Sequence, residues 1–233
     1  MTTITTTTPS STPTIRRAAP EDAEALASFL SHIYSSTYAP HFGAENIARH
    51  FLPVLSRERL LESITLPGQV SHVALAGDDA PPSGPIVGLI QTREEGIPAQ
   101  YLFPASFEAL DLPVDGGFNG ESDSAAGNPR EQDKGKGKAG SIAYVSRLYV
   151  HEAAHGSGLA RTLLSLAEGK VIEQGYERIW LKVLGSNARA VRFYEKSAYA
   201  LVGQQVITEE DKEEGGDWAP RTDLIMLKRL GSA

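Results

Sequence analysis

The chain has 233 residues, of which 41% are hydrophobic, so it is long enough for one sizeable domain or two small ones, and we expect one. Its 22 Lys plus Arg against 29 Asp plus Glu give a net charge of -7, which argues against a general nucleic-acid or anionic-membrane surface and suits a cationic substrate. The alternative interpretation of this net charge is an ordinary acidic protein without a cationic substrate. The absence of cysteine excludes disulfides, thiolate metal sites and a thioester intermediate on the protein.

No apolar run approaches the roughly 20 residues of a spanning helix. The Thr- and Ser-rich start lacks the apolar core of a secretion signal, so we expect a cytoplasmic protein without a membrane partner. Residues 1–13 are nearly all Thr, Ser and Pro, with too little apolar surface to offset the entropy of ordering, and are predicted to form a disordered tail.

The first half of the domain predicts a strand, two helical regions and a hairpin. A strand at 14–18 is followed by a helix that begins near residue 20. Its apolar positions recur at helical spacing and are Leu26, Phe29, Leu30 and Ile33. A second helical region spans about 47–64 with a break near Pro53, and strands at 70–76 and 85–93 then form the hairpin.

The second half begins with residues 104–141, a Gly-, Asp-, Ser- and Lys-rich stretch that we expect to be a disordered insertion in a single domain of residues 14–230. Regular structure resumes with a strand at 142–150 and a helix that starts at 159 and ends at Gly175. An apolar strand at 179–184, a helix capped by Asn187 and strands at 201–207 and 222–227 complete the pattern. Alternating strands and helices indicate an α/β or α+β fold with a mixed sheet.

The most informative segment is the turn between the strand at 142–150 and the following helix. It consists of His155, Gly156, Ser157, Gly158, Leu159 and Ala160. Two glycines let the main chain approach a ligand, and the helix that begins here directs free amides and the positive end of its dipole to one point. The turn therefore predicts an anion site, best suited to the pyrophosphate of an acyl coenzyme. A structural turn with incidental glycines is the alternative.

Two motifs resemble those of the GCN5-related N-acetyltransferases (GNAT). The first reads Gln or Arg, two residues, Gly, one residue, then Gly or Ala, and it appears here as His155, Gly158 and Ala160, with His in place of Gln or Arg. The second is the run Asn-Ala-Arg-Ala-Val-Arg-Phe-Tyr-Glu-Lys at 187–196, which continues as Ala198 and Tyr199 where the family has Gly and Phe. The resemblance implies a GNAT fold, with a mixed central sheet of about seven strands, helices on both faces and a splayed parallel strand pair.

The resemblance also implies acetyl-CoA as cosubstrate and no metal. Main-chain groups of Leu148, Tyr149 and Val150 would pair with the pantetheine arm, an amide there would stabilise the oxyanion, and Asn187 would also bind the pantetheine. Tyr194 would be the general acid for the leaving thiolate, because a phenol of pKa about 10 can protonate a thiolate of thiol pKa about 8.5. The alternative for Tyr194 is core packing.

A base for the protonated amine is not identified by the pattern. Glu94, Glu95, His72 and His151 lie near expected strand ends, and each has a solvated surface role as its alternative. Six histidines without regular spacing give no metal pattern.

The acceptor is expected to be a small primary amine. The stretch 35–51, with His41 and Glu45, and the closing residues 223–228 resemble PaiA-type polyamine acetyltransferases, which suggests spermidine or spermine. Protein N-termini or lysines, a noncatalytic acyl-CoA sensor and a nucleotide-binding protein are the alternatives. We expect no nucleic-acid partner and a homodimer.

Overall fold

The computed structural model describes residues 12–77, 84–103, 105–106, 142–208 and 220–231. The predicted tail at 1–13 and the predicted insertion at 104–141 therefore lie almost wholly outside the described residues. The predicted boundaries of the single domain are not tested by the structure.

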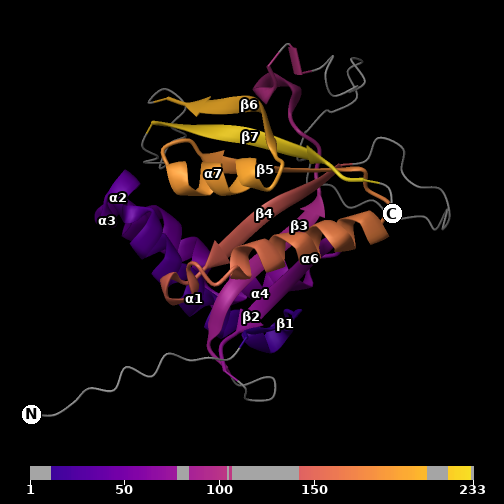
Figure 1. Cartoon of the computed structure of the whole chain (residues 1–233). Coiled ribbons are helices and arrows are strands. Elements are labelled where there is room, and N and C mark those ends of the chain that lie inside the picture. Colours follow the sequence, from indigo (N-terminus) through magenta and orange to yellow (C-terminus); the bar gives the residue numbers. More distant parts are fainter. Residues whose placement is uncertain (1–11, 78–83, 104, 107–141, 209–219, 232–233) are drawn as a thin grey trace, which may run out of the picture. The chain divides into compact units, whose positions relative to one another are not determined.

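Seven strands form one mixed sheet in the order β1-β2-β3-β4-β5-β7-β6 (Figure 1). They are β1 (Thr14–Arg17), β2 (Gln69–Leu75), β3 (Ile86–Glu94), β4 (Ile142–Val150), β5 (Arg178–Leu184), β6 (Ala200–Ile207) and β7 (Arg221–Arg229). The pairs β1 with β2, β5 with β7 and β6 with β7 are antiparallel, whereas β4 and β5 are parallel. The predicted α/β class and strand number are confirmed.

The α-helices are α1 (Ala23–Thr37), α2 (Ala39–Phe42), α3 (Ala44–Asn46), α4 (Arg57–Thr65), α6 (Leu159–Glu173) and α7 (Ala188–Lys196). Helices α1, α4, α6 and α7 lie where the sequence predicts helices, whereas the short helices α2 and α3 were not predicted. Short segments of 3₁₀ or π geometry are η1 (Pro20–Asp22), η2 (Ile47–Phe51), η3 (Leu52–Leu55), η4 (Ala99–Tyr101) and η5 (Glu152–Ala154). Pro53 lies in η3, where the predicted break falls.

The chain divides into two compact units. The first unit comprises residues 1–91 and 147–164, and the second comprises 92–146 and 165–233. The division passes through β3, β4 and α6, so each of these elements contributes residues to both units.

The first unit has a core between α1, α4 and the strands. Leu26 and Leu30 on the buried stripe of α1 pack with Val73 of β2 and Leu89 of β3. On β3 the neighbouring residue, Gly88, is on the opposite face, where a Cβ atom would lie 2.9 Å from Leu163 and 3.3 Å from Leu159 at the start of α6. Helices therefore cover both faces of these strands, as predicted.

The second unit is built around Trp180 of β5, which is fully buried. Its ring stacks on Tyr144 of β4 with centroids 4.3 Å apart, and its Nε1 donates a hydrogen bond of 2.6 Å to the carbonyl of Glu95. Ile225 of β7 and Val202 of β6 belong to the same apolar cluster. The indole ring is thus packed on its apolar face and hydrogen-bonded at its Nε1.

The parallel strands β4 and β5 are paired over only part of their length. Ile142–Val145 of β4 pairs with Arg178–Leu181 of β5, and no further pairing of these two strands is recorded among the described residues. The last five residues of β4 therefore have main-chain groups on that edge that β5 does not use. They include Leu148, Tyr149 and Val150, for which the family resemblance implies pairing with a pantetheine arm.

Candidate functional site

The turn before α6 has the backbone that the sequence predicts. Gly156 and Gly158 have φ values of +82° and +86°, a region that side chains other than glycine rarely adopt. A Cβ atom built on either glycine has no neighbour within 4 Å, so the space beside both residues is open. An incoming group can therefore reach the main chain here.

The amides at the start of α6 are available to a ligand. Thr162 is the first residue of the helix whose amide reaches a carbonyl, that of Gly158 at 3.1 Å. The amide of Leu159 bonds to the Ser157 hydroxyl at 3.3 Å. Among the residues that the structure describes, no hydrogen-bond acceptor is recorded for the amides of Gly158, Ala160 and Arg161. Such a set of donors at the positive end of a helix is a site for a phosphate group.

His155 has a structural role in this turn. Its Nε2 donates a hydrogen bond of 3.0 Å to the carbonyl of Val150, the last residue of β4. The side chain thereby ties the turn to the end of the strand. This contact gives His a function at the position where the family motif has Gln or Arg.

Asn187 is the N-cap of α7, as predicted. Its Oδ1 accepts a hydrogen bond of 3.2 Å from the amide of Ala190. The cap uses the side-chain oxygen and leaves Nδ2 as a donor for another group. Binding of a pantetheine by Asn187 stays a prediction.

Tyr194 lies on the buried face of α7, with 8% of the residue exposed. Its ring makes edge contacts with Phe193 and Tyr199, at centroid distances of 5.2 and 5.7 Å. Burial, and next the neighbouring Tyr144 phenol, raise the pKa of Tyr194 well above its usual value. Its hydroxyl makes no hydrogen bond within the described part of the chain and is not among the fully buried polar atoms that lack a partner. The ring packs against its aromatic neighbours, and the hydroxyl is left without a partner among the described residues.

Tyr144 is a residue that sequence reasoning did not single out. Only its register opposite Trp180 and its electrostatic coupling to Tyr194 mark it. The first depends on strand pairing and the second on how α7 packs, and a single sequence reveals neither.

Each of the four candidate bases has its own neighbours. Glu94 accepts a hydrogen bond of 3.0 Å from the Tyr176 hydroxyl, and Glu95 forms an ion pair with Arg93. His72 lies on β2 opposite Arg17. His151 follows β4 and stacks on His32. The structure selects none of the four as the base.

One set of three potential metal ligands occurs among the described residues. The ligand atoms of His32, His151 and Glu152 lie within 4.8 Å of one another at the surface. Glu152 accepts from His32 Nε2 at 2.8 Å, and His151 Nδ1 accepts from the amide of Ala153 at 3.2 Å. Both contacts are ordinary surface interactions, and the sequence expectation of no metal is not tested by them.

The segment expected to contact the acceptor is aromatic. Tyr34 of α1 and Tyr38, the C-cap of that helix, lie with their ring centroids 5.8 and 6.4 Å from that of Tyr149 on β4. The ring centroid of Phe51 is 5.5 Å from that of Tyr34. Glu45, which the sequence offered as an attractant for a polycation, forms an ion pair of 2.6 Å with Arg49, so its charge is compensated.

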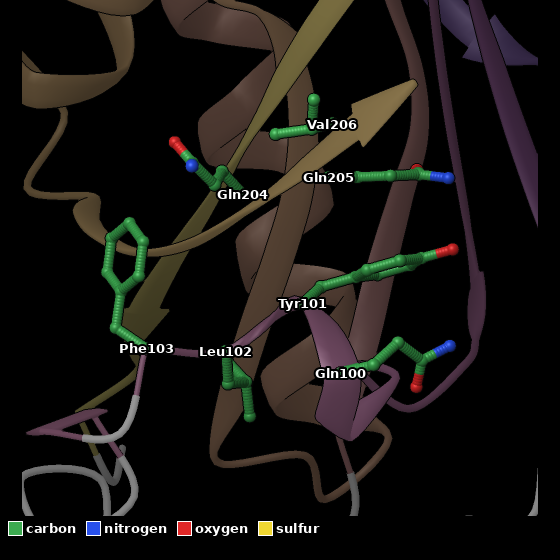
Figure 2. Close-up of a pocket in the computed structure, with 7 residues that line it drawn as sticks. All are labelled: Gln100, Tyr101, Leu102, Phe103, Gln204, Gln205 and Val206. Atoms are coloured by element: carbon green, nitrogen blue, oxygen red, sulfur yellow. The ribbon is translucent and has the colours of Figure 1, made fainter. Parts of the chain in front are cut away.

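A separate pocket of about 380 Å³ lies in the second unit, between residues 100–103 and β6. Figure 2 shows the polar ends of Gln100, Tyr101 and Gln205 pointing to the same side. The backbone is closely packed here, because a Cβ atom at Gly203 would overlap the carbonyl of Tyr101. No residue predicted from the sequence to bind coenzyme or catalyse transfer lines this pocket.

No helix in the described ranges is both long enough and apolar enough to cross a membrane.

Residues 124–199 match the model of the acetyltransferase (GNAT) family. Uncharacterized N-acetyltransferases of Mycobacterium tuberculosis and Mycobacterium bovis are 36% identical to the chain over 59 residues, which is 25% of the chain. The match spans 38% of the length of these curated relatives. Each of these matches covers less than half of the chain, and they show that this segment is similar to GNAT acetyltransferases.

Solved structures show the same fold. The PaiA N-acetyltransferase of Thermoplasma acidophilum in complex with coenzyme A is 20% identical with a TM-score of 0.59, covering 94% of this chain and 99% of that one. Arabidopsis thaliana NAA60 with a bisubstrate analogue is 14% identical with a TM-score of 0.57, covering 95% of this chain and all of that one. At these identities the likeness establishes the GNAT fold.

Proposed function

We propose that the protein is an N-acetyltransferase that moves the acetyl group of acetyl-CoA directly to a primary amine in a ternary complex. The observation that carries the proposal is the turn before α6, whose open glycines and free amides suit the diphosphate of the coenzyme. The family match over 124–199 supports acetyl transfer as the reaction. The chain has no cysteine to hold the acetyl group, which favours direct attack by the substrate amine over a thioester intermediate on the protein.

In the proposed reaction the neutral amine attacks the thioester carbonyl and forms a tetrahedral oxyanion. A main-chain amide of the segment Leu148, Tyr149 and Val150 stabilises that oxyanion, since β5 does not use this part of the β4 edge. The carbon–sulfur bond then breaks, and the thiolate of CoA takes a proton from the Tyr194 hydroxyl, which regains a proton from water before the next turnover. The amine nitrogen loses its own proton to a base or to water.

The raised pKa of Tyr194 bears on this role in two ways. The phenol stays protonated over the whole working range of pH, so it is always in the form that donates. The burial that destabilises a phenolate also destabilises a thiolate brought into the same surroundings, which raises the pKa of the thiol as well.

A polyamine is the acceptor that the sequence resemblance favours, and spermidine and spermine therefore head the panel to be tested. Protein N-termini and lysine side chains are the next acceptors to be tested. A homodimer and a cytoplasmic location are likewise proposed from the sequence.

A noncatalytic acyl-CoA sensor is the second candidate function, and the edge contacts of Tyr194 with Phe193 and Tyr199 are the observation that favours it. A sensor needs the turn but no proton donor. In that case the Tyr194 ring only packs.

Release of free thiol from acetyl-CoA, measured with a panel of amines, tests the proposal and separates the two functions. We expect turnover with at least one primary amine, and a loss of about a hundredfold or more in kcat for Tyr194→Phe with CoA affinity kept. Tyr101→Phe, which removes a phenol from the separate pocket, is the matched control and should keep full activity. CoA binding with no turnover on any amine would favour the sensor, and unchanged kcat in Tyr194→Phe would remove the general acid.

A further inference from the structure

A network of buried polar side chains in the first unit is not explained by the reaction above. Gln69 and Ser71 of β2 and Gln91 of β3 are 5%, 3% and 2% exposed. Buried polar groups lower stability unless they are hydrogen-bonded, so a core that contains several of them must satisfy each one.

The network leads to one charged group. Gln91 Nε2 donates to Ser71 Oγ at 2.8 Å and to Ser63 Oγ at 3.1 Å, and Gln69 Nε2 donates to Ser63 Oγ at 2.8 Å. Arg147 of β4 then donates from Nη1 to Ser63 Oγ at 3.0 Å and to Gln91 Oε1 at 2.9 Å. The network thus holds one nitrogen of a half-buried guanidinium in a fixed position.

Every partner of this guanidinium is neutral. In the described part of the chain no carboxylate forms an ion pair with Arg147. Two other half-buried arginines, Arg16 and Arg221, do pair with carboxylates, those of Asp22 and Asp223. Neither Nε nor Nη2 of Arg147 hydrogen-bonds to a described residue, and neither is among the fully buried polar atoms that lack a partner. The guanidinium therefore has two further donors, in a planar fork, that no described residue uses.

Hydroxyl groups lie beside this charge. Tyr149 is two residues further along β4, so its side chain is on the same face of the strand as Arg147. Its hydroxyl donates to that of Tyr34 at 3.3 Å, and no acceptor among the described residues is recorded for the proton of Tyr34. Burial raises the pKa of both phenols, and the positive charge of Arg147 opposes that rise at each, as expected for a guanidinium near both hydroxyls. Arg147 and Tyr149 thus share one face of β4, and the Tyr34 hydroxyl contacts Tyr149 there.

We propose that Arg147 binds a carboxylate carried by the amine that receives the acetyl group. The inference rests on the proposed function and names its substrate class. Arg147 directly precedes Leu148, Tyr149 and Val150, the segment proposed to hold the thioester, so a group bound by its side chain belongs to the acceptor end of the coenzyme. A carboxylate matches the single positive charge and the planar pair of donors, whereas a phosphate would bring up to two charges against one cation.

This inference moves the acceptor away from the polyamines. Spermidine and spermine have no carboxylate and carry the same sign of charge as Arg147. A compound with both a primary amine and a carboxylate, such as an amino acid, fits the two features together.

The experiment compares acceptors that differ only in the carboxylate: lysine with cadaverine and ornithine with putrescine, with spermidine included. Values of kcat/KM are measured for the wild type, Arg147→Gln and Arg147→Lys. We expect the amino acid of each pair to be favoured by about tenfold or more in the wild type, since a hydrogen bond to a charged group has about that effect. Arg147→Gln should remove this advantage, and Arg147→Lys should restore part of it because the charge remains without the fork.

The control variant is Arg59→Gln on α4, which removes an exposed positive charge paired with Glu62 and should leave the ratio unchanged. CoA affinity and melting temperature, measured for each variant, show that the turn and the fold are intact. If Arg147→Gln does not fold, Arg147→Lys alone carries the comparison.

A wild type that prefers the decarboxylated member of both pairs, or a ratio that Arg147→Gln leaves unchanged, overturns the inference while the proposed function stands. If no amine is acetylated, the proposed function fails, and calorimetry with lysine and cadaverine then decides the inference. Binding of lysine that Arg147→Gln abolishes supports it, and equal binding of both compounds, or of neither, overturns it.

Discussion

Arg16 and Asp22 are joined by two parallel hydrogen bonds of 2.7 Å, from Nη1 to Oδ2 and from Nη2 to Oδ1. The same carboxylate accepts a third bond of 2.7 Å from the amide of Ala19. Asp22 thus links β1 to the start of α1. Because its side chain is only 8% exposed, the pair lies where removal of one partner leaves a poorly solvated charge.

Asp22→Asn should lower the free energy of unfolding by about 1–3 kcal/mol near pH 7. Burial alone would raise the pKa of Asp22, but the hydrogen bonds from Arg16 and Ala19 and the charge of Arg16 outweigh it and lower the pKa below 3.8. Since the folded pKa is the lower one, this stabilisation is complete above about pH 4 and is lost as pH falls through the folded value. Urea unfolding at neutral and acidic pH checks both statements, and a difference between wild type and variant that does not shrink in acid would contradict them.

Glu168 of α6 accepts hydrogen bonds from Lys228 at 2.7 Å and from Tyr199 at 3.1 Å. Glu168→Gln should cost about 1–3 kcal/mol, because it leaves the half-buried ammonium of Lys228 without its counter-charge. The pair Lys170 and Glu173 on the same helix has the same 2.7 Å distance but is exposed, so Glu173→Gln should cost well under about 1 kcal/mol. Equal losses from the two variants in thermal or urea unfolding would show that burial is not the cause.

His155→Ala should weaken CoA binding by a factor of about 2–10, the effect of one hydrogen bond, without abolishing it. The reason is that the imidazole ties the turn to Val150, while the amides that face the ligand belong to the main chain. His155→Gln should stay within about twofold of the wild type, since an amide nitrogen can donate to the same carbonyl. Calorimetric titration with CoA measures both. A complete loss of binding in His155→Ala would instead mean that the imidazole contacts the ligand.

Local patterns in the sequence were sufficient to predict most of the elements. The buried stripe of α1, the cap at Asn187 and the turn at Gly156 and Gly158 each depend on residues within a few positions of one another, so periodicity and turn chemistry identify them. The strand order, with β7 between β5 and β6, depends on pairing between distant segments and was not predicted.

The candidate site, like the fold, was predicted from the sequence only where it depends on neighbouring residues. The main-chain part of the site follows from the turn itself. The network that joins Gln69, Ser63, Gln91 and Arg147 connects α4 and three strands. No motif in the sequence marks these contacts, because each residue in them is ordinary in its own segment.

The central claim is that the turn before α6 binds the diphosphate of CoA, and titration of CoA into Gly158→Ala tests it most directly. Gly68→Ala is the matched control, since Gly68 has a φ of +79° and open space like Gly158 but lies between α4 and β2. Both variants should lose about 1–2 kcal/mol of stability from the strained backbone. We predict that only Gly158→Ala weakens CoA binding, by tenfold or more, because its methyl group occupies the space of the phosphate. Wild-type affinity in Gly158→Ala, or an equal loss in Gly68→Ala, would contradict the account.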